Sequence, residues 1–136
     1  MRLQLTDELL TSIRSIQEKS REGSAWHRRQ LELIAAGLEA VRGLPAEPIE
    51  ENAEFKRVRQ SKRNQVWRWA HSYEEGIAVR LILWFTPEGD VVVALFVGEK
   101  ARIGDVWYDS VGSRADTLIE LWKWRREGRA RMEGEE

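Results

Sequence analysis

The chain of 136 residues carries 22 basic and 23 acidic residues, a formal net charge of −1. Its length fits one domain, and 42% hydrophobic residues with seven tryptophans can fill a core. The lack of cysteine excludes a disulfide scaffold and a thiolate metal site. No apolar run approaches the ~20 residues of a membrane span, and the N-terminus lacks the apolar region of a signal peptide. We therefore expect a soluble cytoplasmic protein that does not enter membranes.

The first predicted elements are a short strand and a hairpin of two helices. Arg2–Leu5 alternates in polarity like an edge strand, and Thr6 is an N-cap for a helix over Asp7–Glu22. Ser24 caps a second helix over Ala25–Arg42. Apolar residues recur at helical spacing in both helices, and the link between them is short. This pattern predicts an antiparallel helical hairpin with one core-facing stripe on each helix.

Positive charge is concentrated in residues 56–80, where 7 basic and 2 acidic residues give a net charge of +5. An acidic loop over Ala46–Ala53 precedes this block, and Phe55–Arg63 is predicted to be a short strand or an ordered arm. A protein of near-zero net charge with one basic face can bind a polyanion there. The alternative is a charged segment that is only solvated.

Three apolar runs, Val66–His71, Ile77–Phe85 and Val91–Val97, predict the central strands. The links between them are short and rich in Gly, Pro, Asp and Glu, so neighbouring strands should pair antiparallel. Val91–Val97 is apolar throughout, as in a strand covered on both faces. Side chains alternate in the first run, which puts Arg68 on one face and His71 on the other.

A final helix is predicted to begin at Ser113, with Asp116 as its capping-box partner. A charged tail over residues 127–136 is predicted to fray. The order of elements is then β–α–α–β–β–β–α in a single domain over residues 1–126. We predict an α+β fold in which one helical layer, the hairpin, covers a small antiparallel sheet.

This order and four sequence pieces resemble the RelE/ParE toxin superfamily over roughly residues 2–124. The pieces correspond to the family's Arg-bearing strand, its all-apolar strand, its Gly-Lys-Arg-like segment and its "VY" step: Ala78–Leu83, Val91–Val97, Gly98–Arg102 and Asp105–Tyr108. The resemblance implies a RelE-like fold and the toxin of a type II toxin–antitoxin system, bound by a cognate antitoxin protein. RelE-like members cleave mRNA on the ribosome without a cofactor, whereas ParE-like members inhibit gyrase.

RNA cleavage by metal-independent 2′-OH attack requires side chains to perform three catalytic functions. The 2′-OH must lose its proton, the phosphorane charge must be stabilised, and the 5′-oxygen must be protonated. Arg, Lys, Tyr and His side chains together supply all three. The candidate catalytic residues are Arg80, Lys100, Arg102, Tyr108 and His71.

Each candidate has a structural alternative. The Arg80 guanidinium suits a scissile phosphate, but it would also pair with a local carboxylate such as Glu99 or Asp105. Lys100 and Arg102 follow an apolar strand, where they either stabilise charge or are ordinary solvated residues.

Two candidates, Tyr108 and His71, would transfer protons. Tyr108 either does so or packs in the core beside Trp107. A shift of one residue decides whether Trp107 or Tyr108 faces the site. Histidine is the usual proton-transfer group near neutral pH, so His71 is either such a group or a structural or merely exposed residue.

A further set of cations is expected either to hold the RNA backbone or to form a solvated arm. These RNA-binding candidates are Arg68, Lys56, Arg57, Arg59, Lys62 and Arg63. Two distant histidines and no suitable carboxylate cluster give no metal site. The competing functions are an mRNA endoribonuclease, a non-enzymatic gyrase inhibitor, and a non-toxic RNA-binding module on the same fold.

Overall fold

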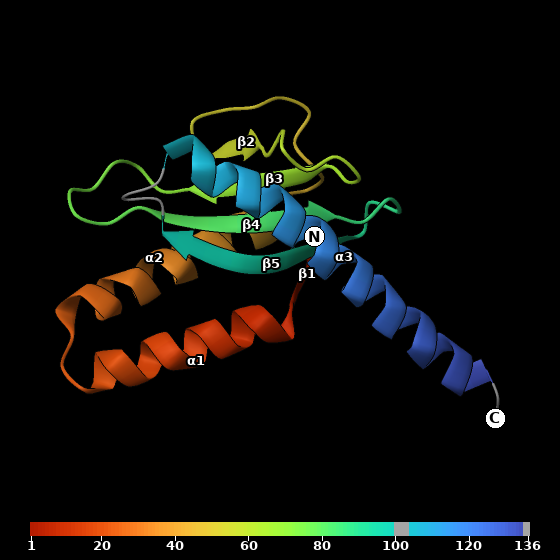
Figure 1. The fold of residues 1–136 in the computed structure, drawn as a ribbon, viewed down its shortest axis with the longest axis horizontal. Coiled ribbons are helices and arrows are strands. Elements are labelled where there is room, and N and C mark those ends of the chain that lie inside the picture. The colour runs from red at the N-terminus through yellow and green to blue at the C-terminus, as the bar shows by residue number, and fades with distance from the viewer. Residues whose placement is uncertain (100–103, 135–136) are drawn as a thin grey trace.

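The computed structural model describes the backbone of residues 1–99 and 104–134 and the side chains of residues 1–98 and 110–129. Within these residues the chain forms five strands and three helices (Figure 1). In chain order the elements are β1 (Arg2–Leu5), α1 (Asp7–Arg21), α2 (Ala25–Arg42), β2 (Phe55–Arg57), β3 (Val66–Ala70), β4 (Val79–Phe85), β5 (Val91–Glu99) and α3 (Gly104–Gly134). The α+β class is thereby confirmed.

The strands form one sheet in the order β1-β5-β4-β3-β2. The predicted antiparallel pairing of the two most apolar strands is confirmed, with Leu81 opposite Val97 and Trp84 opposite Val93. β1 is an edge strand, as predicted, and it runs parallel to β5. β2 occupies three residues of the predicted strand or arm and forms the other edge, antiparallel to β3.

The helical hairpin covers one face of the sheet, which we call the hairpin side. The Thr6 side chain accepts from the backbone N–H of Leu9, and Ser24 accepts from that of His27, so both predicted N-caps are confirmed. The buried stripes of α1 and α2 pack against alternate residues of β3, β4 and β5. This layer holds Leu9, Ile16, Leu33, Ile34, Val41, Trp67, Trp69, Leu81, Leu83 and Val92.

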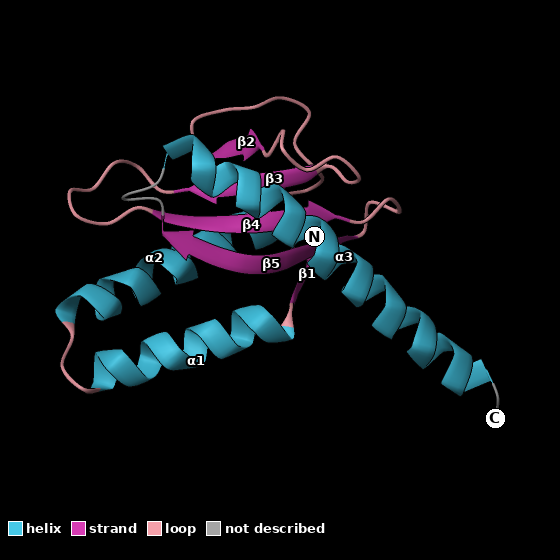
Figure 2. Cartoon of the chain, viewed as in Figure 1, coloured by secondary structure: helices cyan, strands magenta, loops and turns pink. Residues whose placement is uncertain are grey.

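The opposite face of the sheet, the α3 side, carries a second core. Val111, Ala115 and Ile119 of α3 pack on residues of β3, β4 and β5 that alternate with those of the first core. The expectation of a single helical layer was therefore wrong, because helices cover both faces (Figure 2). Strands β4 and β5 are buried between the two layers, in keeping with their almost unbroken apolar sequence.

The last helix begins earlier and ends later than predicted. It starts at Gly104, so Ser113 and Asp116 lie inside α3 and do not cap it. The apolar stripe already includes Val111, four residues before Ala115, and a helix must therefore be under way before Ser113. α3 also continues to Gly134, through the segment for which a frayed tail was predicted, and its C-terminal turns extend beyond the sheet (Figure 1).

Candidate nucleic-acid interface

Three cations lie on the α3 side of the sheet, one on each of three adjacent strands. Arg68 alternates with Trp67 and Trp69 of the hairpin-side core, so its side chain belongs to the other face. The same alternation puts Arg80 on the face of Ile82, whose side chain is in the α3-side core. Lys56 of β2 is the cross-strand partner of Arg68 and shares its face. We call Lys56, Arg68 and Arg80 the basic row.

The register of the strands makes the basic row continuous. Lys56 lies directly opposite Arg68, and Arg68 lies opposite Ile82, which puts Arg80 at a diagonal position about 7–8 Å from Arg68 between Cα atoms. The cross-strand partner of Arg80 on β5 is Gly98, so the residue directly opposite Arg80 has no side chain. Like charges on facing strands repel each other.

The Arg80 guanidinium is only partly satisfied by the described residues. Its Nη1 donates to the carbonyl of Val79 (3.1 Å), whereas its Nε is buried and makes no hydrogen bond within the described part of the chain. A buried donor without an acceptor is costly, and an incoming phosphate oxygen would relieve that cost. The side chains of Glu99 and Asp105, the alternative partners of Arg80, lie outside the described residues.

The outer cations fall into different environments. Arg57 faces Trp67 across the β2–β3 pair and therefore projects on the hairpin side, away from the basic row. Arg59 Nη2 contacts both carboxylate oxygens of Glu51 at 3.3 Å. The backbone N–H of Arg57 donates to Glu51 and, with the charge of Arg59, lowers the pKa of that carboxyl. Arg59 is thus paired with a carboxylate from the loop that precedes β2.

Lys62 and Arg63 lie in the loop over residues 58–65 between β2 and β3, which we call the basic loop. Both side chains are exposed. The loop is attached to α3 by hydrogen bonds to Asp116, a contact that joins residues 55 positions apart. No local pattern marks such a contact in the sequence.

His71 is held by backbone groups on both ring nitrogens. Its Nδ1 lies 2.7 Å from the carbonyl of Ser72, and its Nε2 accepts from the backbone N–H of Val79 at 3.0 Å. A ring that accepts through Nε2 and faces a carbonyl through Nδ1 carries its single proton on Nδ1. His71 therefore closes the β3–β4 loop, and these contacts favour a structural role.

The β3–β4 loop is further fixed by α2. Arg29 donates to both carboxylate oxygens of Glu74, with a closest approach of 2.7 Å, and these bonds hold the pKa of Glu74 below its ordinary value. The Trp26 indole donates to the Gly76 carbonyl at 3.0 Å, and Gly76 has a φ of 81°. The loop nevertheless presents Tyr73 with 91% of its surface exposed.

The side chains of three candidate catalytic residues lie outside the described residues. Lys100 and Arg102 lie outside the described residues. Tyr108 is in the first turns of α3, but its side chain and that of Trp107 also lie outside them. The described part of the site is therefore the basic row with its adjoining loop.

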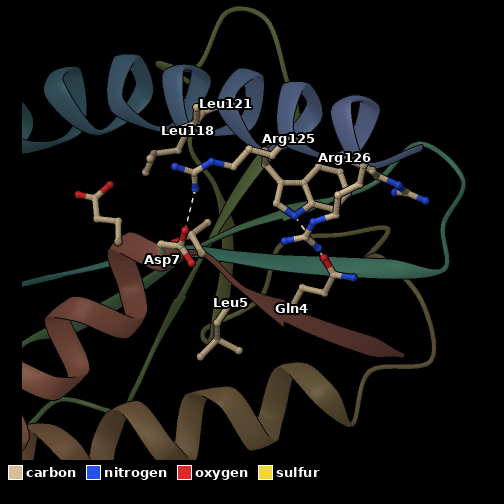
Figure 3. Close-up of a pocket in the computed structure, with 11 residues that line it drawn as sticks. Gln4, Leu5, Asp7, Leu118, Leu121, Arg125 and Arg126 are labelled. Carbon is tan, nitrogen blue, oxygen red and sulfur yellow. Dashed lines mark hydrogen bonds and ion pairs between the residues drawn. The ribbon is translucent and has the colours of Figure 1, made fainter. Parts of the chain in front are cut away.

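A separate cavity of about 510 Å³ lies between the β1–α1 junction and α3 (Figure 3). Arg125 reaches across it to Asp7 (2.9 Å), and the Trp122 indole donates to the Gln4 side chain (3.2 Å). The guanidinium of Arg126 lies 5.1 Å from the centre of the Trp122 ring. The first two of these contacts fasten α3 to β1 and to the start of α1.

Within the described residues, no three His, Cys, Asp or Glu side chains are grouped so as to hold a metal ion. No described helix has the length and apolar content to cross a membrane. Comparison of the chain with known protein families, curated proteins and solved structures gave no match.

Proposed function

We propose that the protein binds RNA through the phosphate backbone at the basic row. The observation that carries this is the continuous line of Lys56, Arg68 and Arg80 across three strands on one face. At its inner end, Arg80 Nε has no acceptor among the described residues. Guanidinium groups in a fixed frame suit phosphate oxygens, and a row of cations follows a single strand of RNA. The resemblance to RelE-type toxins supports the same ligand.

The biochemical role we propose is the toxin of a type II toxin–antitoxin system that cleaves mRNA on the ribosome. The 2′-oxygen attacks phosphorus as its proton leaves, and the bond to the 5′-oxygen breaks as that oxygen takes up a proton. Arg80 and Arg102 would stabilise the phosphorane charge. Lys100 and Tyr108 are the remaining proton-transfer candidates, since both ring nitrogens of His71 are engaged by the backbone.

A second candidate is a non-enzymatic protein on this fold, either a ParE-like inhibitor of gyrase or a non-toxic RNA-binding module. The engagement of His71 favours it, because the acid–base group best suited to neutral pH is then occupied elsewhere. In every toxin version, a cognate antitoxin with an acidic segment would cover the basic face near Arg68, Arg80 and Arg102.

The test is growth arrest on expression, followed by mapping of RNA ends and translation-coupled mRNA cleavage with purified variants. Arg80→Ala should lower the cleavage rate by roughly a hundredfold, about 3 kcal/mol, because one charged transition-state donor is lost. Arg102→Ala should act alike. Arg59→Ala is the matched control, since its charge is already paired with Glu51. Circular dichroism verifies that each variant is folded.

The outcomes separate the candidates. If Arg80→Ala and Arg102→Ala both cleave at the wild-type rate, the catalytic site lies elsewhere. If the wild type cleaves no mRNA on translating ribosomes but arrests growth, the gyrase-type function takes precedence. Failure of the wild type both to bind RNA and to capture a small acidic partner protein encoded beside it would remove the proposal.

A further inference from the structure

One carboxylate fastens the basic loop to α3. The Ser61 hydroxyl and the Asn64 side-chain amide both donate to Asp116 Oδ1, at 2.6 and 3.0 Å. The backbone N–H of Lys62 lies 3.4 Å from Asp116 Oδ2. Three successive parts of the loop thus converge on a single side chain of the helix, with Lys62 and Arg63 between the outer two.

A second contact brings the backbones of the loop and the helix together. A Cβ atom at Gly112 would lie 2.5 Å from the Gln60 carbonyl carbon and 2.7 Å from the Ser61 nitrogen. Only glycine allows the helix to approach the loop so closely. Val58 at the start of the loop and Val111 of α3 are both buried in the α3-side core. The loop is therefore held at several points.

The residues that this anchoring displays are cationic. Lys62 and Arg63 are exposed, and within the described residues neither forms an ion pair with a carboxylate. They line a cavity of about 750 Å³ between loop and helix, together with Ser113 and Thr117 of α3. The loop leaves β2 just after Lys56, a member of the basic row, and enters β3 just before Arg68. Its cations therefore lie on the connection between two of the strands that carry the basic row.

We propose that Lys62 and Arg63 form a second contact with the RNA backbone and that Asp116 is the positioning residue that holds them. This inference rests on the proposed RNA binding. A loop fixed in advance does not lose conformational entropy when RNA binds, whereas a released loop does. Asp116 thus favours RNA binding although it carries the same charge as RNA.

That role predicts an effect opposite in sign to simple electrostatics. Removing a carboxylate beside two cations should by Coulomb's law strengthen the binding of an anion. If Asp116 positions the loop, its removal should weaken binding. Glu120 provides the comparison, because it lines the same cavity but pairs with Lys123 on its own helix (3.6 Å).

The experiment measures binding of fluorescein-labelled polyuridine RNA by fluorescence anisotropy at several salt concentrations. Asp116→Ala should raise the dissociation constant roughly tenfold, since an unfastened loop must be ordered on binding. Asp116→Asn keeps one acceptor oxygen and should give a smaller loss. Glu120→Gln should bind as tightly as the wild type or more tightly. Trypsin should cleave Asp116→Ala after Lys62 and Arg63 faster than it cleaves the wild type.

A double-mutant cycle distinguishes positioning from a general loss of stability. Lys62→Ala combined with Arg63→Ala should weaken binding and lower its salt dependence, and adding Asp116→Ala should then cause no further loss. Circular dichroism checks each fold. Additive losses, or an Asp116→Ala variant that binds as tightly as Glu120→Gln, would overturn the positioning role while leaving the proposed RNA binding in place. A wild type that binds no RNA would overturn both.

Discussion

The imidazole of His71 joins the end of β3 to the start of β4. It supplies the acceptor for the backbone N–H of Val79, a fully buried residue. Protonation of the ring at Nε2 would remove that acceptor and bring a second donor against the amide. A proton-transfer role for His71 would therefore disrupt its hydrogen bond with Val79 at each turnover, which favours a structural role.

Replacing His71 by alanine should lower the free energy of unfolding by about 1–3 kcal/mol, because the buried Val79 N–H loses its only side-chain acceptor among the described residues. Urea unfolding followed by circular dichroism measures this. If His71→Ala instead retained full stability and abolished RNA cleavage, His71 would be a catalytic residue after all.

The sequence can predict the position of a single side chain only where the repeat of a strand or helix determines that position. The opposite faces of Arg68 and His71 follow from the two-residue period of a strand and were predictable, whereas the common face of Arg68 and Arg80 also depends on the register. The partners of His71 and Asp116 were not predictable, because no repeat relates His71 to Val79 or Asp116 to Ser61. Such tertiary hydrogen bonds appear only when the chain is folded.

Helix α2 packs unusually close to the sheet at Gly37. A Cβ atom there would lie 2.6 Å from both Leu81 Cδ1 and Trp69 Cε3. Those atoms belong to side chains in the hairpin-side core, where packing leaves little room to move. Gly37 lies inside α2, where no turn requires glycine, so its role is to allow close packing of the helix on the sheet.

Gly37→Ala should destabilise the protein by about 1–3 kcal/mol, because overpacking outweighs the gain of about 1 kcal/mol that alanine brings to a helix. Gly128→Ala is the control. Gly128 lies in α3, where an added Cβ atom would have no neighbour within 4 Å, so alanine there should stabilise the protein or leave its stability unchanged. Thermal unfolding of both variants measures the difference, and equal effects would show that α2 can shift away from the sheet.

At the scale of elements, N-cap residues and the spacing of apolar residues predicted α1, α2 and the central strands, because both signals lie within the element itself. The start of α3 was missed because a serine near an apolar stripe looks like an N-cap, although the stripe begins earlier at Val111. The side of the sheet that α3 covers was also unpredictable. An amphipathic stripe shows that a helix has one buried face, but it does not identify the surface that buries it.

Across the whole molecule, α3 links the α3-side core to the beginning of the chain. Trp122 packs edge-on against Trp84 with ring centres 5.4 Å apart and donates to Gln4 of β1. Arg125 pairs with Asp7. After these contacts the helix extends away from the sheet (Figure 1), and Trp124 retains 69% of its surface exposed. The stabilising part of α3 thus ends within one turn of Trp122.

This division predicts different results for two changes in one helix. Trp122→Ala should lower the free energy of unfolding by about 2 kcal/mol, less than for a fully buried tryptophan because the ring is only half-buried. Deleting residues 128–136 should change it by less than about 0.5 kcal/mol, since the side chains from Trp124 to Arg129 are all exposed. Chemical unfolding of both proteins measures these values. A large loss of stability in the truncated chain would mean that residues beyond Glu127 contact the body of the protein. An unaffected Trp122→Ala would mean that the other contacts of α3, such as those of Val111, Ala115 and Ile119, are enough to fix it.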